Sequence, residues 1–204
     1  MSDILEINNV SRETMEKLKA YEKLVLEWNN RFNLISKSSE QFIWERHIED
    51  SFQLCNFITQ KNEILYDFGS GAGFPAIVIA IIAQEYYPNL KVSLIESIGK
   101  KANFLNTVKD ELKLNITVYN DRVENLKLPK ADIISSRAMA SLSKLLEYAK
   151  PFCKTSTILL FPKGEKWNEE VLEAKKKWNF EYKTEQSLTS ETGCILQIKN
   201  IRRI

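Results

Sequence analysis

Residues 67–75 read Asp-Phe-Gly-Ser-Gly-Ala-Gly-Phe-Pro, and this segment decides the fold. The apolar run Ile64–Phe68 leads into it and predicts a strand, and the apolar stretch Ala76–Tyr86 after it predicts a helix. Glycines at alternate positions let a backbone turn tightly and approach a ligand that side chains would keep away. The order strand, glycine loop, helix is typical of a nucleotide-binding α/β domain.

The chain beyond residue 62 alternates short apolar runs with amphipathic segments, which favours a mostly parallel sheet covered by helices. Six further strands are expected, at Val92–Glu96, Ile116–Asn120, Ile133–Ser136, Ile158–Phe161, Phe180–Thr184 and Cys194–Ile201. Three further helices are expected, at Gly99–Leu112, Leu142–Tyr148 and Glu169–Trp178. The polar stretch 185–193 between the last two strands suggests a hairpin. We therefore expect a Rossmann-like α/β fold with a seven-stranded, mostly parallel sheet.

Two amphipathic helices are expected ahead of this sheet. The first spans residues 11–30 with Ser11 as its N-cap, and the second spans Glu40–Ile58, after a turn-like stretch at residues 33–39. The chain thus divides into an N-terminal helical cap at residues 1–60 and a Rossmann-like domain at residues 61–204, which form one structural unit.

Composition narrows the class of protein. A length of 204 residues suits one domain, and a formal net charge of +2 is too small to require a polyanionic partner. The longest apolar stretch, Phe74–Ala83, is far shorter than the roughly 20 residues that cross a bilayer, and residues 1–10 carry no signal-peptide pattern. The three cysteines form no CxxC pair, so no metal site is expected. We expect a cytoplasmic protein, most simply a monomer.

The glycine loop favours S-adenosylmethionine over a dinucleotide. Its pattern is GxGxG through Gly69 and Gly71, whereas dinucleotide loops read GxGxxG. Asp67 would repel phosphates but suits the ammonium group of S-adenosylmethionine. Glu96, at the end of the second predicted strand, can accept hydrogen bonds from both ribose hydroxyls. The backbone at residues 123–124, after the third strand, is expected beside the adenine.

The sequence indicates the methyl acceptor less directly than it indicates the methyl donor. An exocyclic amine calls for an (Asn/Asp)-Pro-Pro-aromatic loop after the fourth strand, where this chain reads Ser135-Ser136-Arg137. Cytosine C5 chemistry needs a cysteine nucleophile, and no cysteine follows that strand directly. Guanine N7 has a lone pair and no proton to lose, so it needs no general base. The absence of an obvious base is compatible with N7 chemistry.

Several motifs together resemble the RsmG (GidB) family, the guanine-N7 methyltransferases of small-subunit ribosomal RNA. They run along most of the chain and comprise Trp28–Leu34, Arg46–Ser51, the glycine loop with Phe74 and Pro75, Glu96 and Ser97, Lys100, Lys101, Phe104 and Leu105, Arg122–Glu124, Ser136–Ala138, and Lys163 and Gly164. The family usually has a glycine after the loop proline, where this chain has Ala76.

The resemblance implies an S-adenosylmethionine-dependent enzyme that methylates N7 of a guanine in 16S ribosomal RNA. It places cofactor contacts on Gly69, Phe74, Val123, Glu124 and Arg137. The implied partner is small-subunit ribosomal RNA, either free or in an assembling small subunit.

Three further residues are candidates for positioning the substrate. Arg137 follows the fourth strand and could hold a phosphate, the base or a cofactor carboxylate; its alternative is an ion pair with Asp67 or Glu124. His47 is the only histidine, and it is either a packing residue or, with its polar neighbours, part of the acceptor side. Lys163 follows the fifth strand and could meet an RNA phosphate.

Two other functions stay open on the sequence. One is a methyltransferase for a small molecule or a protein side chain, which would act independently of salt, whereas RNA binding weakens steeply with salt. The other is a non-catalytic RNA-binding assembly factor, which would bind no cofactor.

Overall fold

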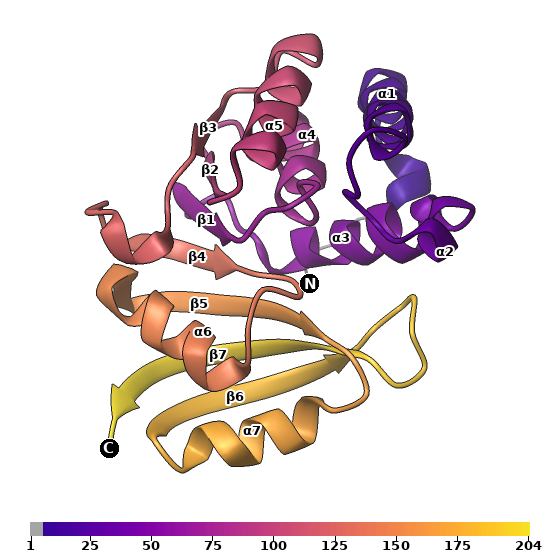
Figure 1. Cartoon of the computed structure of the whole chain (residues 1–204). Helices are drawn as coiled ribbons and strands as arrows, with labels where there is room; N and C mark the ends of the chain where they lie inside the picture. Colours follow the sequence, from indigo (N-terminus) through magenta and orange to yellow (C-terminus); the bar gives the residue numbers. More distant parts are fainter. Residues whose placement is uncertain (1–5) are drawn as a thin grey trace.

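A computed structural model describes residues 6–204, and the first five residues of the expected cap lie outside it. In the described chain, seven strands form one sheet in the order β3-β2-β1-β4-β5-β7-β6 (Figure 1). The strands are β1 (Ile64–Phe68), β2 (Lys91–Ile95), β3 (Ile116–Tyr119), β4 (Ala131–Ser135), β5 (Cys153–Lys163), β6 (Trp178–Gln186) and β7 (Cys194–Arg203). Neighbours among β1 to β5 are parallel, and β7 is antiparallel to both β5 and β6. The expected sheet and its closing hairpin are confirmed.

Helices cover both faces of the sheet, and alternate strand residues point to the two cores. One core holds Leu65 under α4 (Ala76–Tyr86) and α5 (Gly99–Glu111). The other holds Tyr66 under α6 (Leu142–Ala149) and α7 (Trp167–Lys175). The prediction that Trp178 ends a helix was wrong: Trp178 begins β6, since its buried side chain packs in this second core.

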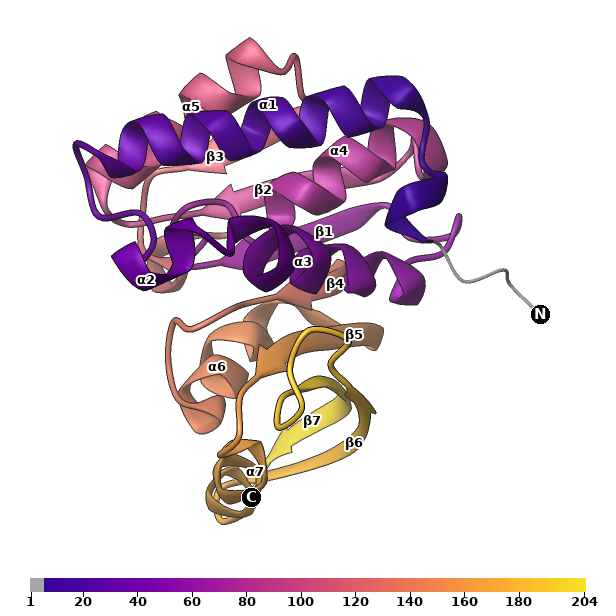
Figure 2. The same ribbon diagram turned by 90° about the vertical axis from the view of Figure 1, so that its right-hand side faces the viewer.

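The cap packs onto the first core. Its long helix, α1 (Arg12–Asn29), lies along α4 and α5, as Figures 1 and 2 show together. Residues 76–83 of α4 are all buried, because α1 covers the side that the sheet leaves open. Ser11 caps α1 as predicted, since its Oγ accepts a hydrogen bond of 3.2 Å from Thr14 N.

The second cap helix was predicted as one element at residues 40–58, and this was wrong. A short helix α2 (Lys37–Glu40) lies almost wholly ahead of it, in the stretch predicted as a turn. Within the segment, a π-helical turn (Trp44–Glu49), a short α3 (Asp50–Phe52) and a 3₁₀ turn (Gln53–Phe57) follow one another without a gap, so the helix changes type along its length. The Ser51 hydroxyl donates to the His47 carbonyl and the Gln53 amide donates to the Asp50 carbonyl, so side chains compete for the backbone groups of a regular helix. π-helical turns often lie at functional sites.

None of the helices in residues 6–204 combines the length and the apolar character that a membrane span requires.

Candidate active site

The glycine loop adopts a backbone that only glycine enters freely. Gly69, Gly71 and Gly73 have φ angles of +66°, +57° and +97°. A Cβ on Gly69 would lie 2.6 Å from Cγ of Met139, and one on Gly73 would overlap the Ile77 side chain. Local conformation and packing therefore both require glycine, and they shape the loop as the sequence predicted.

The cap holds this loop from outside the domain. The buried Tyr21 hydroxyl of α1 donates a hydrogen bond of 2.6 Å to the carbonyl oxygen of Ala72, and its ring centroid lies 5.1 Å from that of Phe74. Phe74 was predicted as a cofactor contact, but its ring is buried between Tyr21 and His47. The structure thus gives Phe74 a packing role as well.

Glu96 joins the loop to the next strand. Its Oε2 accepts from Gly71 N and its Oε1 accepts from Ile98 N, both at 2.8 Å, and the residue is 5% exposed. A carboxylate offers about four acceptor positions, so two remain for the predicted ribose hydroxyls. The structural tie to Gly71 was missed, because no local pattern links residues 71 and 96.

Asp67 presents an unsatisfied oxygen at the end of β1. Its Oδ1 accepts a hydrogen bond of 2.7 Å from the Ser135 hydroxyl, whereas the buried Oδ2 has no hydrogen-bond partner within residues 6–204. Burial raises the pKa of Asp67 to about 7, against the lowering effect of the Ser135 hydrogen bond. Buried polar atoms are normally paired, so this oxygen fits the ammonium group of S-adenosylmethionine.

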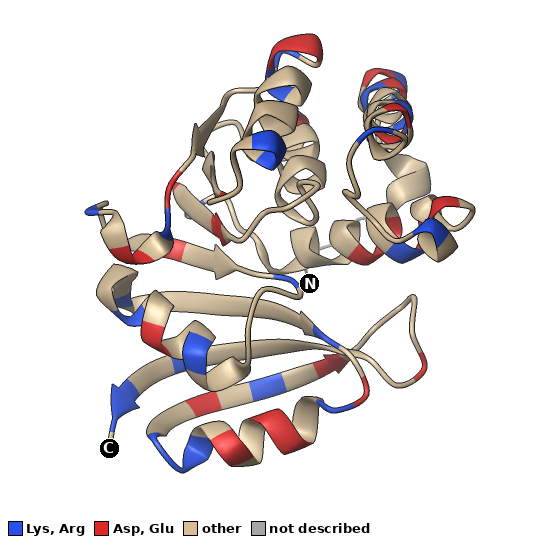
Figure 3. Cartoon of the chain, in the orientation of Figure 1, with Lys and Arg blue, Asp and Glu red and all other residues tan. Residues whose placement is uncertain are grey.

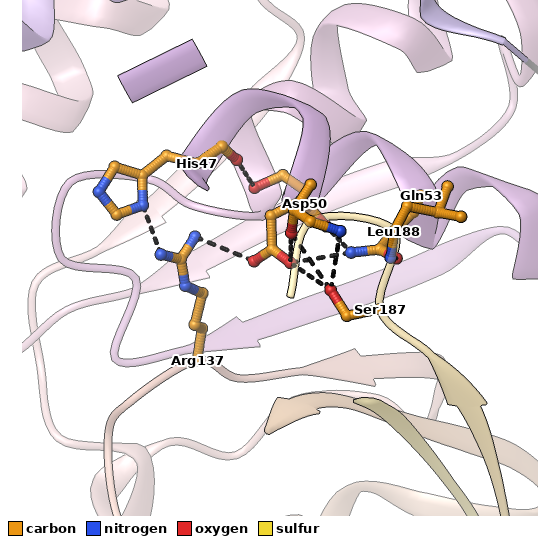
Figure 4. Close-up of polar contacts among 8 residues, drawn as sticks. His47, Asp50, Gln53, Arg137, Ser187 and Leu188 are labelled. Atoms are coloured by element: carbon orange, nitrogen blue, oxygen red, sulfur yellow. Dashed lines mark hydrogen bonds and ion pairs between the residues drawn. The ribbon is translucent and has the colours of Figure 1, made fainter. Parts of the chain in front are cut away.

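Arg137 lies between the domain and the cap (Figure 4). Its Nη1 lies 3.4 Å from Oδ2 of Asp50, and its Nη2 hydrogen bonds to Nδ1 of His47. The sequence had suggested Asp67 or Glu124 as an ion-pair partner for Arg137. The ion pair exists, but its carboxylate comes from the cap.

His47 carries its proton on the ring nitrogen that does not contact Arg137. A guanidinium only donates, so Nδ1 must accept, and the proton of the neutral ring is then on Nε2. Burial first, and the charge of Arg137 second, lower the pKa of His47 to about 4, so the ring is neutral at pH 7. Nε2 is buried without a hydrogen-bond partner among the described residues. The ring also stacks on Phe74, with centroids 4.9 Å apart.

Asp50 connects the cap to the loop between β6 and β7. Its Oδ1 accepts from Gln53 Nε2 at 2.8 Å and from Thr189 Oγ1 at 2.9 Å, while Oδ2 faces Arg137. Gln53 Oε1 in turn accepts from Leu188 N at 3.1 Å (Figure 4). The sequence placed Asp50 in a polar group of the cap but gave no sign of these distant partners.

Two cavities meet at Met139, which lines both. The smaller, of about 130 Å³, is lined by Gly69, Val123 and Glu124, the residues predicted at the adenosine end. The larger, of about 720 Å³, is lined by His47, Arg137 and residues of the β6–β7 loop. The predicted donor and acceptor sides thus lie next to each other.

Lys163 is not the free cation that its prediction assumed. Its Nζ lies 2.8 Å from Oε2 of Glu170, and its side chain is 10% exposed. Glu170 Oε2 also accepts from Leu142 N, at the start of α6. Lys163 thus forms an ion pair at the wall of the larger cavity, and its contact with an RNA phosphate stays a prediction.

The sheet order, the glycine loop and the unsatisfied Asp67 oxygen define a class I S-adenosylmethionine-dependent methyltransferase. Solved structures share this fold. An O-methyltransferase from Bacillus cereus in complex with SAH superposes with a TM-score of 0.59 at 15% identity, covering 89% of this chain and 91% of that one. M. jannaschii TYW2 in complex with AdoMet gives 0.51 at 16% identity, covering 98% and 81%.

Comparison with sequence relatives identifies the family, whereas the solved structures identify only the fold. The family model described as GidB, rRNA small subunit methyltransferase G, matches residues 14–198. A ribosomal RNA small subunit methyltransferase G from Cereibacter sphaeroides is 43% identical over 196 residues, covering 96% of this chain and 95% of the relative. One from Ruegeria pomeroyi is 40% identical over 196 residues, covering 96% of each. The chain belongs to the rRNA small subunit methyltransferase G family, which confirms the resemblance drawn from its motifs.

Proposed function

We propose that this chain transfers a methyl group from S-adenosylmethionine to N7 of a guanine in small-subunit ribosomal RNA. The observation that carries this proposal is the state of His47. Its Nδ1 lone pair is taken by Arg137, and its Nε2 carries the proton. The imidazole therefore has no free lone pair and cannot take a proton from an acceptor.

This state suits an acceptor that has no proton to lose. An amine or a hydroxyl must give up a proton during methylation, whereas guanine N7 attacks with a lone pair. Two carboxylates also lie near the loop. The free oxygen of Asp67 is assigned to the donor's ammonium and Ser135 holds its other oxygen, whereas Glu96 accepts from Gly71 and Ile98 and is assigned to the ribose. N7 chemistry needs neither group as a base.

The chain's own part in the reaction is alignment. S-adenosylmethionine supplies an electrophilic methyl group on a sulfonium, and transfer is an in-line displacement. In the proposal, Asp67 holds the ammonium, Glu96 the ribose, and the backbone at Val123 and Glu124 the adenine, while Arg137 and His47 face the acceptor. Holding reactants aligned and dry can supply several kcal/mol of the barrier, roughly 7–11 in favourable cases.

The partner is proposed to be small-subunit ribosomal RNA or an assembling small subunit, and the protein is proposed to act in the cytoplasm as a monomer. Light scattering tests the oligomeric state. Parallel assays on free RNA and on purified subunits identify the substrate form.

The function is tested with labelled S-adenosylmethionine and small-subunit RNA from cells that lack this protein. We expect label in 7-methylguanosine after nuclease digestion. A transcript made with 7-deazaguanosine, which has carbon in place of N7, is the control and should stay unlabelled. Label in another nucleoside, or undiminished label in the 7-deaza transcript, would contradict the proposal.

A further inference from the structure

The cavity of about 720 Å³ lies where four segments of the chain approach one another. Its walls come from the cap at Arg46–Asp50, the loop after β4 at residues 137–140, the end of β5 at residues 162–164, and the β6–β7 loop at residues 187–193. Figure 2 shows that the last loop lies close below the cap. The volume is within the range of roughly 300–1,000 Å³ of small-molecule pockets.

Two cations inside this cavity face carboxylates, although Nη1 of Arg137 makes no hydrogen bond within residues 6–204. Arg137 faces the carboxylate of Asp50, and Lys163 faces that of Glu170. Of the wall segments, only the cap segment carries Arg together with Asp and Glu, and the β6–β7 loop carries a single acidic residue (Figure 3). A phosphate binds best to unpaired cations, so this interior suits a neutral group that exchanges hydrogen bonds.

The rim of the cavity differs from its interior, because it presents an exposed cation and an exposed aromatic ring. Arg46 also lines the cavity, and its guanidinium lies over the ring of Phe42, 5.2 Å from the centroid. Phe42 is 42% exposed. A cation and an aromatic face at one edge suit a phosphate and a neighbouring stacked base of a nucleic acid.

Gly164 lines the wall of this cavity at a position with open space beside it. Its φ lies outside the left-handed region, and a Cβ there would meet no atom within 4 Å. Neither backbone conformation nor packing within the chain calls for glycine at this position, unlike at Gly69 or Gly73. Glycine also serves where a ligand approaches the backbone closely.

The floor of the cavity meets the donor site. Met139 separates it from the cavity at Gly69, Val123 and Glu124. His47 lines the same space, and its Nε2 is buried behind the wall without a partner among the described residues. A group in this cavity would therefore lie next to the predicted donor site, with Met139 between them.

We propose that this cavity takes the acceptor guanine as a single base, withdrawn from the stack of the RNA, with its flanking phosphates outside beside Arg46. Asp50 holds the pocket together, since it ties Arg137 and Thr189 to the cap. Enzymes that modify a base have to reach it outside the helical stack. This inference rests on the proposed function, and it adds where and in what form the substrate binds.

The test fills the pocket without removing any polar contact. Gly164→Trp places an indole at the open wall, and Glu165→Trp is the matched control, because Glu165 is exposed and does not line the cavity. We expect Gly164→Trp to lose roughly 100-fold in kcat/KM for RNA. Its affinity for S-adenosylmethionine should stay within about twofold of the native protein, which also shows that it is folded. Full RNA methylation by Gly164→Trp would overturn the proposal.

A second measurement uses the native protein. RNA carrying 6-thioguanosine at the acceptor position is irradiated in the complex, and the crosslinked peptides are identified. Crosslinks to residues 137–140, 162–164 or 187–193 support the pocket, and crosslinks confined to other segments overturn it. If the native protein makes no 7-methylguanosine, the proposed function fails, whereas the crosslink still reports where the RNA base lies.

Discussion

The proposed contact of the buried Asp67 carboxyl group with the ammonium of S-adenosylmethionine predicts that cofactor binding depends on pH near neutrality. Its pKa is raised to about 7, chiefly by burial, so only about half of the free protein carries the carboxylate at pH 7. A protonated carboxyl cannot form an ion pair with the ammonium of S-adenosylmethionine. We therefore expect binding to tighten as the pH rises, with loss of a proton from Asp67.

The magnitude follows from the ionised fraction. With a pKa of about 7, the carboxylate fraction rises from about one in eleven at pH 6 to one in two at pH 7. The apparent Kd should therefore fall about fivefold over this interval. Asp67→Asn should abolish this slope and weaken binding by about 1.5–3 kcal/mol, the usual value of a hydrogen bond to a charged group.

The same carboxyl group affects the stability of the free protein, in the opposite direction. Since its pKa is raised from 3.8 on folding, the folded state holds the proton more tightly, and the free energy of unfolding falls as the pH rises from about 4 to about 7. The loss is on the order of 4 kcal/mol at most. Urea unfolding of the free protein at pH 5 and pH 7.5, with Asp67→Asn alongside, measures it.

Titration calorimetry at pH 6 and pH 7, in two buffers of different ionisation enthalpy, measures the affinity and the released proton together. A pH-independent Kd for the native protein would falsify the assignment of Asp67 to the ammonium. The same slope in Asp67→Asn would show that another group titrates, and it would refute the reasoning equally.

Three further substitutions test the supports of the site. Asp50→Asn removes the carboxylate that holds Arg137 beside His47. We expect the guanidinium to move away, so that its lowering effect is lost and the pKa of His47, now about 4, rises. Proton–nitrogen NMR of the tag-free, single-histidine protein measures this, and roughly tenfold slower RNA methylation should accompany it. An unchanged imidazole spectrum would argue against the link. Gly73→Ala should lower the free energy of unfolding by about 1–3 kcal/mol in urea, because of its left-handed φ and crowded surroundings. Glu96→Gln should weaken S-adenosylmethionine binding about tenfold in calorimetry, and unaltered affinity would remove Glu96 from the cofactor site.

The sheet was predictable because its central strands are short apolar runs with turns at both ends. The bounds of β1 and α4 agree with the predictions, since the glycine loop separates them. β5 begins five residues earlier than the expected Ile158, at Cys153. Its added part is polar and is held by side chains: Thr157 Oγ1 donates to the Ala131 carbonyl at 2.6 Å, and Lys154 pairs with Asp132. Hydrophobic periodicity does not register such contacts.

The cap shows a different limit of prediction from the sequence. An α-helix and a π-helical turn place apolar side chains at nearly the same spacing, so residues 40–58 read as one helix. The helical run continues through these residues but changes type, and the Ser51 and Gln53 side chains donate to backbone carbonyls within it. His47 lies in the π-helical turn and Asp50 at the start of α3, and both face Arg137.

The residues of the candidate site could be selected from the sequence by type, but their contacts with one another could not. Arg137 meets a histidine 90 positions away, and Asp50 meets Thr189 at a separation of 139. No single-sequence pattern links positions so far apart; only the packing of the cap against the last hairpin brings them together. The roles assigned to the cofactor residues Gly69, Val123 and Glu124 depended on short-range order along the sheet edge, and these residues do line one cavity.

The ion pairs of Arg137 and Lys163 bear on how this protein would recognise RNA. Two of the cations that the sequence suggested for the substrate, Arg137 and Lys163, each face a carboxylate, and the whole chain carries a net charge of only +2. A protein that neutralises many phosphates needs free cations, and its affinity then falls steeply with salt. Few unpaired cations lie inside the cleft of this chain. Selection of the acceptor therefore has to depend on shape and on hydrogen bonding to a base. A pocket assembled from the cap, the sheet edge and the last hairpin provides both, and it exists only when all three are folded together.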